Sequence, residues 1–141
     1  MLKDQMKLVG KLSIAINNKV VQEINNLVVT TGKNFVASRI KDATSNAMSH
    51  MAIGTGSTSP AAGDTTLGTE TARVALTSTT VTNADVAYVS SFGAGTGTGA
   101  ITEAGLFNAS SAGTMLCRTT FSVVNKGADD SMTITWTVTV S

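Results

Sequence analysis

The strongest constraint on the fold is a strict alternation of apolar and polar residues near the end of the sequence. Every second residue of residues 131–140 is apolar, namely Met132, Ile134, Trp136, Val138 and Val140. The residues between them are serine or threonine, namely Ser131, Thr133, Thr135, Thr137 and Thr139. Successive side chains of a β-strand point to opposite faces of a sheet, so the pattern predicts a strand with one buried face. Trp136 lies at the centre of the apolar series, and we expect it to anchor the core.

Weaker alternation predicts about eight short strands in all, over residues 7–16, 19–30, 50–53, 73–82, 85–92, 101–108, 114–121 and 131–140. Asn17 and Asn18 tolerate positive φ, so the first two strands are expected to form an N-terminal β-hairpin. A helix is expected at about residues 31–47, where four apolar residues recur at helical spacing: Val36, Ile40, Ala43 and Ala47. These elements predict a mainly β protein, an antiparallel β-sandwich or flattened barrel of about eight strands with one α-helix.

Composition favours one folded core and argues against several kinds of partner. A chain of 141 residues, 42% of them hydrophobic, can enclose a single core. Its net charge of +1 provides no field to gather nucleic acid or an anionic membrane, so neither partner is expected. No stretch approaches the roughly 18 apolar residues of a membrane span. No secretory signal is recognisable at residues 1–4, and Cys117 is the only cysteine, so we expect synthesis inside the cell.

Side chains that could support catalysis or bind a metal are few. His50 is the only imidazole and starts a predicted strand, so a structural histidine is expected. Cys117 lies in another apolar strand, where a small buried side chain is expected. Glycoside hydrolysis needs two carboxylates that face each other. Glu70 and Glu103 are candidates for such a pair, but only because few other acids lie outside turns. The glycines of residues 93–99 lack the spacing of a dinucleotide fingerprint. We therefore expect no enzyme, no cofactor and no metal.

Three short motifs follow the predicted helix in order. Residues 50–56 read His-Met-Ala-Ile-Gly-Thr-Gly, residues 67–73 read Leu-Gly-Thr-Glu-Thr-Ala-Arg, and residues 101–107 read Ile-Thr-Glu-Ala-Gly-Leu-Phe. In order and spacing, residues 31–141 resemble the N-terminal particle-attachment domain of bacteriophage tail-fibre proteins. That family has a helix, a strand like "THMAVGDG", a long loop, an "L-x-N-E-x-x-R" turn and an "I-x-E-x-G-L-F" strand.

The resemblance implies structural roles for the motif residues. A carboxylate between small residues can cap backbone amides at a bend, which is the role expected for Glu70 and Glu103. Arg73 is expected to pair with one of these carboxylates, and Gly105 belongs to the third motif. Ala72 departs from the family, which has an aromatic residue before the motif arginine.

The resemblance also implies a function in a virion. We expect a non-enzymatic structural protein of a bacteriophage, assembled in the host cytoplasm, that forms a small oligomerising module at the tail or baseplate, as a fibre adaptor or attachment subunit. The sequence ends just after the last strand, so no fibre shaft is expected. The alternative is a decoration or cement protein that binds the major capsid protein and stabilises the head. A carbohydrate-binding module or a hydrolase is a weaker alternative, because no convergent set of polar or aromatic residues is apparent.

Two segments are expected to make contact with partners. Residues 1–30 lie outside the resemblance, and residues 1–42 hold seven basic and three acidic groups, against three basic and six acidic in residues 43–141. We therefore predict that the N-terminal hairpin is an assembly arm outside the main domain, which spans residues 31–141. Residues 54–69 form a loop that is long for a compact domain, with the only proline and four glycines, so it too is expected to have a role or a partner. Homo-oligomers and other virion proteins are the expected partners.

Overall fold

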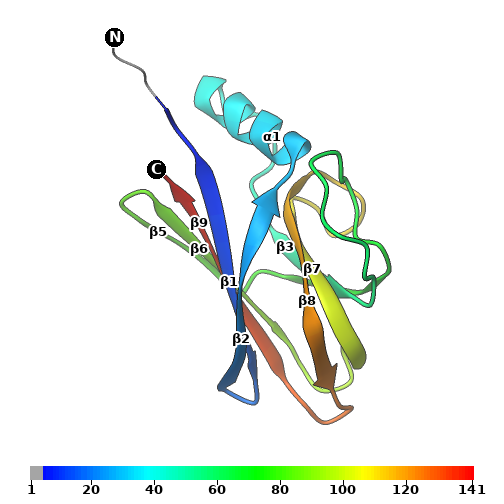
Figure 1. Cartoon of the computed structure of the whole chain (residues 1–141). Coiled ribbons are helices and arrows are strands. Elements are labelled where there is room, and N and C mark those ends of the chain that lie inside the picture. The colour runs from blue at the N-terminus through cyan, green and yellow to red at the C-terminus, as the bar shows by residue number, and fades with distance from the viewer. Residues whose placement is uncertain (1–4) are drawn as a thin grey trace.

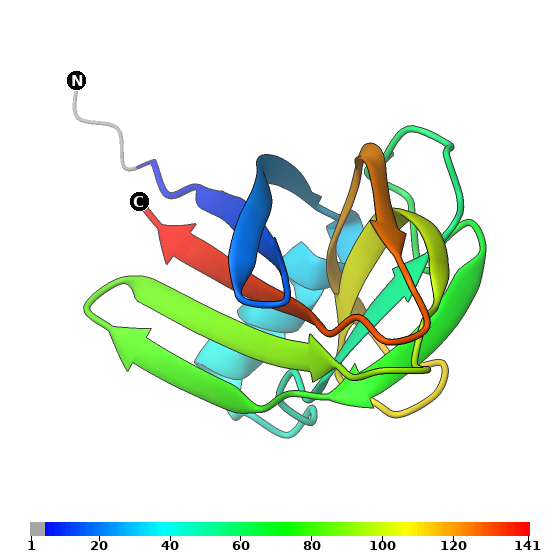
Figure 2. The ribbon, with the colours of Figure 1, turned by 90° about the horizontal axis from the view of Figure 1, so that it is seen from below.

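The computed structural model describes residues 5–141. Residues 1–4 lie outside the described part; they include the start of the predicted N-terminal arm and the residues at which no secretory signal was recognised. Nine strands and one helix occur in the order β1 (Leu8–Ile16), β2 (Lys19–Val28), α1 (Thr30–Lys41), β3 (His50–Gly54), β4 (Glu70–Ala75), β5 (Ser78–Thr82), β6 (Asp85–Phe92), β7 (Gly99–Phe107), β8 (Met115–Lys126) and β9 (Met132–Val140). All strand pairs are antiparallel, and the strands curl around a common interior (Figures 1 and 2). The predicted mainly β class, with one helix and an N-terminal hairpin, is confirmed.

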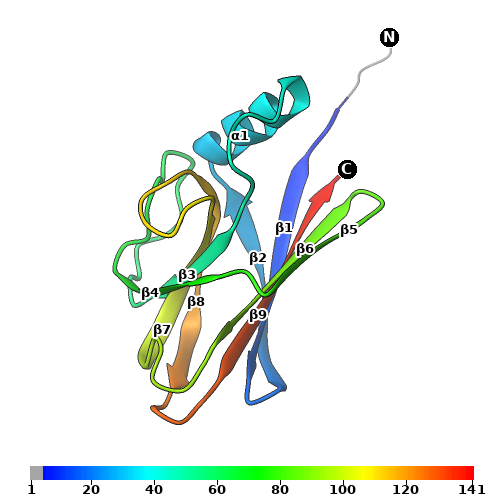
Figure 3. The same cartoon turned by 180° about the vertical axis from the view of Figure 1, so that it is seen from behind.

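The sheet consists of two halves that meet at β2. One half contains β4, β3, β7 and β8, and the other contains β2, β1, β9, β6 and β5. Only the end of β2 pairs with β8, through Leu27 opposite Arg118 and Val28 opposite Cys117. On the far side the chain passes directly from β4 to β5, so one bent segment forms the last strand of both halves (Figure 3). This arrangement gives the curled sheet a sandwich-like interior.

The ninth strand arises from a bend that the sequence pattern did not reveal. We predicted one strand over residues 73–82, but the chain bends at Leu76 and Thr77. The amide of Leu76 still donates to Ser49, beside β3, whereas the amide of Thr77 donates to Val89 in β6. The two partners belong to different halves of the sheet, so the bend transfers the chain from one half to the other.

The alternation in β9 produces the core as expected. Trp136 is completely buried, and β9 lies between β1 and β6, with Trp136 opposite Leu12 and Tyr88. Met132 and Ile134 are also completely buried on this face. The apolar side chains of the strand therefore face inward, and its threonine side chains face outward.

The predicted separation of the N-terminal hairpin from the core is wrong. Its turn at Asn17 and Asn18 has positive φ at both residues, as expected. However, β1 pairs with β9 along its whole length, from Leu8 opposite Val140 to Ile16 opposite Met132. Leu12 and Ile14 are completely buried, so the hairpin supplies central strands and part of the core.

The helix is shorter than predicted, because α1 ends at Lys41 and the expected extension to residue 47 is wrong. Beyond it, the carboxylate of Asp42 accepts a hydrogen bond from the backbone amide of Thr44, and Ala43 has a φ of 56°. This local turn competes with helix continuation. Ala43 therefore lies outside the helix, and Ile40, which belongs to the same predicted apolar stripe, is 78% exposed.

The start of α1 is fixed by close contact with β8. Thr31 does not cap the helix but donates from its hydroxyl to the carbonyl of Met115. Gly32 is the buried residue of α1, and a Cβ at this position would collide with the carbonyl of Leu116. The helix lies across the end of the sheet at which β1 begins and β9 ends (Figure 1).

Candidate functional site

The loop of residues 55–69 is held against β7 by one buried carboxylate. Glu103 lies on β7, between β3 and β8, and is completely buried. Its side chain accepts hydrogen bonds from the backbone amides of Gly56, Gly68 and Thr69, each at 2.7 Å. The two ends of the loop are therefore fastened to the same side chain.

Arg118 on the neighbouring strand completes this cluster. Its Nη2 lies 3.0 Å from Oε1 of Glu103 and also donates to the carbonyl of Thr58 at 2.9 Å. Its Nη1 lies 2.9 Å from the carboxylate of Asp64. Only 2% of Arg118 is exposed, and its buried charge is balanced by the carboxylates of the buried Glu103 and the partly exposed Asp64. The middle of the loop is thus fastened to β8, as its ends are to β7.

The charge state of Glu103 follows from these contacts. Burial of the carboxylate by itself would raise its pKa. The backbone amides of Thr69 and Gly68, the guanidinium of Arg118 and the amide of Gly56 favour the charged form and together hold the pKa of Glu103 below its ordinary value. Glu103 is therefore an anion at neutral pH whose acceptor positions are taken.

Apolar contacts reinforce the fastened loop. Leu67 is nearly buried and belongs to a small cluster with Val29, Ala52, Phe107 and Met115. Gly105 lies beneath it: a Cβ on this glycine would come within 3.0 Å of a methyl carbon of Leu67 and 3.1 Å of the Phe107 ring. The third motif therefore supplies both the anion and the space that the loop needs.

Glu70 and Arg73 form a second junction on β4. The guanidinium of Arg73 makes two bonds with the Glu70 carboxylate, at 3.0 and 2.7 Å, and its carbon lies 3.7 Å from the centre of the Phe107 ring. The same guanidinium donates to the carbonyls of Ala109 and Ala112. Arg73 thus joins β4 to the connection between β7 and β8.

The two carboxylates considered for glycoside hydrolysis are therefore occupied in different junctions, Glu103 under the long loop and Glu70 beside Arg73. His50 is half-buried, and its Nδ1 lies 2.8 Å from the hydroxyl of Ser49. Across residues 5–141 no group of three or more histidine, cysteine or acidic side chains is placed to hold a metal ion. Nor does this part of the chain contain a helix with the length and apolar character to cross a membrane.

The glycine-rich connection of residues 93–98 is ordered from within the chain. Gly95 and Gly97 have positive φ, of 82° and 70°, which other residues rarely adopt. The amide of Gly95 donates to Ala128, and the ammonium group of Lys126, only 1% exposed, donates to the carbonyl of Gly93 at 2.8 Å.

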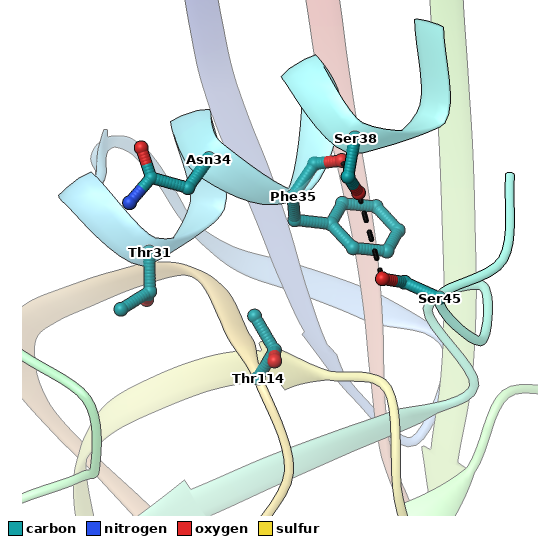
Figure 4. A pocket seen from close by; sticks show the side chains of 6 residues that line it. All are labelled: Thr31, Asn34, Phe35, Ser38, Ser45 and Thr114. Atoms are coloured by element: carbon teal, nitrogen blue, oxygen red, sulfur yellow. Dashed lines mark hydrogen bonds between the residues drawn. The ribbon is translucent and has the colours of Figure 1, made fainter. Parts of the chain in front are cut away.

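A pocket of about 290 Å³ lies between α1 and the segments that follow α1 and precede β8. Its lining consists of hydroxyl and amide side chains with one aromatic ring: Thr31, Asn34, Phe35, Ser38, Ser45 and Thr114 (Figure 4). The hydroxyl of Ser38 lies 3.5 Å from that of Ser45 and donates to the carbonyl of Phe35. None of the lining side chains is an acid or a base, so the pocket offers no group for proton transfer.

A second hollow, about 450 Å³ in volume, opens between α1 and the end of the sheet. Its lining is almost entirely apolar: Met6, Leu8, Val36, Ala37, Ile40 and Val140, with Lys33. Met6 is 75% exposed and Ile40 is 78% exposed, so this apolar groove is open to solvent. Exposed apolar surface of this kind is typical of places where proteins bind one another.

The sequence predicted the contact residues of this region unevenly. It singled out Glu103, Arg73 and Gly105 but missed Arg118, Asp64 and the amides of the loop. A signal for Arg118 was present, because it is the only charged residue of residues 114–121, as Glu103 is of residues 101–108. One acid and one base, each alone in consecutive apolar strands, predict a buried pair. The chain matches no protein-family model, no curated protein and no solved structure.

Proposed function

We propose that this chain is a non-enzymatic structural protein of a bacteriophage virion, an oligomerising module at the tail or baseplate that serves as a fibre adaptor or attachment subunit. One observation carries the proposal. The three motifs on which the resemblance to tail-fibre attachment domains rests meet at Glu103. Glu103 belongs to the third motif, and it accepts hydrogen bonds from Gly56 of the first motif and from Gly68 and Thr69 of the second.

This convergence gives the motifs a shared physical purpose. The loop of residues 55–69 crosses the outside of the sheet without secondary structure of its own, and such a loop would be mobile unless it were fastened. Glu103 and Arg118 hold it in one conformation, so its outer surface is preformed for a partner. Preformed contact surfaces suit a protein that must fit repeatedly into one assembly.

The exposed apolar surface supports an assembly role as well. The groove beside α1 leaves Met6 and Ile40 largely in water, and Val81 is 68% exposed. Only 13% of the residues are charged, so few charges keep neighbouring copies apart. Surfaces of this kind are most stable when another subunit or virion protein covers them.

A decoration or cement protein of the phage head is the second candidate. The same apolar, weakly charged surfaces would suit binding to a capsid lattice. The two locations differ in copy number, because a head lattice offers many more equivalent positions than a tail or baseplate does.

Quantitative mass spectrometry of purified particles from the phage or prophage that encodes this chain tests the proposal. We expect the chain in the particle, at a copy number that matches tail proteins. A copy number that matches the major capsid protein would move the assignment to the head. Absence from particles that contain the other tail and head proteins would overturn the proposal.

A further inference from the structure

The two outer strands of the sheet differ in how well they are protected from further pairing. On β4, the exposed residue Glu70 binds Arg73, and Arg73 reaches across to the carbonyls of Ala109 and Ala112. On β5, all five side chains are exposed, and the sequence Ser-Thr-Thr-Val-Thr contains no charge and no proline. Charges and covering loops are the usual means of blocking an outer strand, and within residues 5–141 β5 has neither.

The direction of the free hydrogen-bonding groups of β5 can be read from its neighbours. The amide of Val140 donates to the carbonyl of Ala84, a pattern in which the backbone groups of Asp85 turn away from β9 and toward β5. Asp85 pairs with Thr82 across the two-residue turn at Asn83 and Ala84, where Asn83 has a φ of 54°.

The pairing of Thr82 with Asp85 gives the direction of the backbone groups along the rest of β5, because this direction alternates from one residue to the next. Thr82 and Thr80 direct their backbone groups toward β6, so Thr79 and Val81 direct theirs away from the sheet. No strand of the described chain pairs with that side of β5. Two residues therefore present a free amide and a free carbonyl each, on an uncharged strand.

We propose that β5 pairs antiparallel with β5 of a second copy, about a two-fold axis that passes beside Thr80. In this register Thr79 lies opposite Val81 of the second copy, and Val81 lies opposite its Thr79. Each of these two pairs can form two backbone hydrogen bonds, and Thr80 faces its own counterpart at the axis. The two five-stranded halves would then form one continuous sheet.

A second copy fits this strand better than other occupants. The strand carries no charge, so equivalent residues meet across the axis without like-charge repulsion. At the axis Thr80 meets Thr80 of the second copy, and threonine pairs across antiparallel strands are favourable. Each contact strand is only five residues long, so we expect a weak dimer whose population rises with concentration. The inference rests on the proposed function, in that an assembling virion protein gains a defined contact between subunits.

Charge substitutions at Thr80 test the pairing. Thr80 is exposed and its amide faces β6, so Thr80→Lys and Thr80→Glu should leave the fold intact, which circular dichroism can verify. Sedimentation velocity is expected to find a concentration-dependent dimer for the unmodified chain. Each variant alone should raise the dissociation constant by about tenfold or more, because like charges meet at the axis. An equimolar mixture of the two variants should recover the dimer.

Thr71→Lys on β4 provides the matched control, because it places the same charge on the other outer strand. We expect this variant to dimerise as the unmodified chain does. A chain that is monomeric at every concentration, or a mixture that fails to recover the dimer, would overturn the inference. Particle composition tests the proposed function separately: a chain that dimerises through β5 but is absent from particles overturns only the virion assignment.

Discussion

Arg118 and Glu103 form a buried ion pair in which Nη2 and Oε1 are 3.0 Å apart, and together they hold the long loop. The two residues lie on neighbouring strands, β8 and β7, of one half of the sheet, and neither contacts bulk water. A buried ion pair is in general a weak source of stability, because desolvation of the two charges offsets their attraction. Here three backbone amides share the carboxylate, so the removal of the charge would affect the loop as well as the pair.

Glu103→Gln is therefore expected to destabilise the fold strongly. The amide group of glutamine would place donors against backbone amides that are themselves donors, and Arg118 would keep an incompletely balanced charge. Loss of one partner of a buried pair costs about 3–5 kcal/mol. Thermal unfolding of Glu103→Gln and of the control Glu70→Gln measures the difference. Glu70 is partly exposed, so its substitution should cost about 1 kcal/mol or less. Equal melting temperatures for the two variants would contradict the role assigned to Glu103.

Acid should loosen the same junction. The pKa of Glu103 is lowered in the folded protein, so between that pKa and the value of an unfolded glutamate, about 4.3, the unfolded chain binds more protons than the folded chain. The contribution of Glu103 is thus complete above about pH 4.3 and is lost as the pH falls through the folded-state pKa. Denaturant unfolding as a function of pH should reveal this loss in the unmodified chain and a smaller loss in Glu103→Gln. An identical pH dependence in both chains would contradict it.

Trp136→Ala tests the anchor of the core. The indole is completely buried between Leu12 and Tyr88, and truncation of such a side chain costs about 3–5 kcal/mol. Since small domains are stable by only about 5–15 kcal/mol, the variant should melt at a much lower temperature or fail to fold. Thr135→Ala, its neighbour on the outer face of β9, should have a small effect. A melting temperature of Trp136→Ala near that of Thr135→Ala would contradict the prediction.

The features that the sequence predicted well are local. Alternation in β9 and the paired asparagines of the first turn act over a few residues, so their consequences could be derived without knowledge of the fold. The bend at Leu76 and Thr77 could not, because it depends on which strands lie on either side. The same reason explains the wrong position of the N-terminal hairpin: nothing in residues 8–16 indicates that their partner is β9, at the other end of the chain.

The junction at Glu103 was predictable in part. Glu103 stood out because it belongs to the third motif, and a carboxylate that is alone among apolar residues must find partners when it is buried. Its main partners are backbone amides of a loop, and backbone amides leave no mark in the sequence. Arg118 could have been found by the same reasoning, whereas Asp64 is one acid in a polar loop and has no distinguishing context.

Arg73→Lys should release the connection between β7 and β8 with little effect on the rest of the fold. Lysine cannot reproduce the two parallel bonds to Glu70 or the flat contact with Phe107. We expect faster amide exchange in residues 108–114 and a modest decrease in the melting temperature. Arg39→Lys is the control, because Arg39 is exposed and lies farther from its aromatic neighbour, 5.9 Å from the centre of Phe35. Unchanged exchange in residues 108–114 would contradict the role of Arg73.

A chain that lacks residues 1–30 is expected not to fold. Such a deletion removes β1 and β2, which together pair with β9 and β8, and it uncovers Trp136 on the side that Leu12 occupies. Circular dichroism should find no cooperative thermal transition in the truncated chain. Leu12→Ala in the full chain makes the same test with a smaller change: loss of this completely buried side chain should cost about 2–5 kcal/mol. Lys11→Ala, on the opposite face of β1 in a surface pair with Glu23, should cost about 1 kcal/mol or less. A truncated chain that still melts cooperatively would mean that β3 to β9 fold without the hairpin, which would then be an appended arm after all.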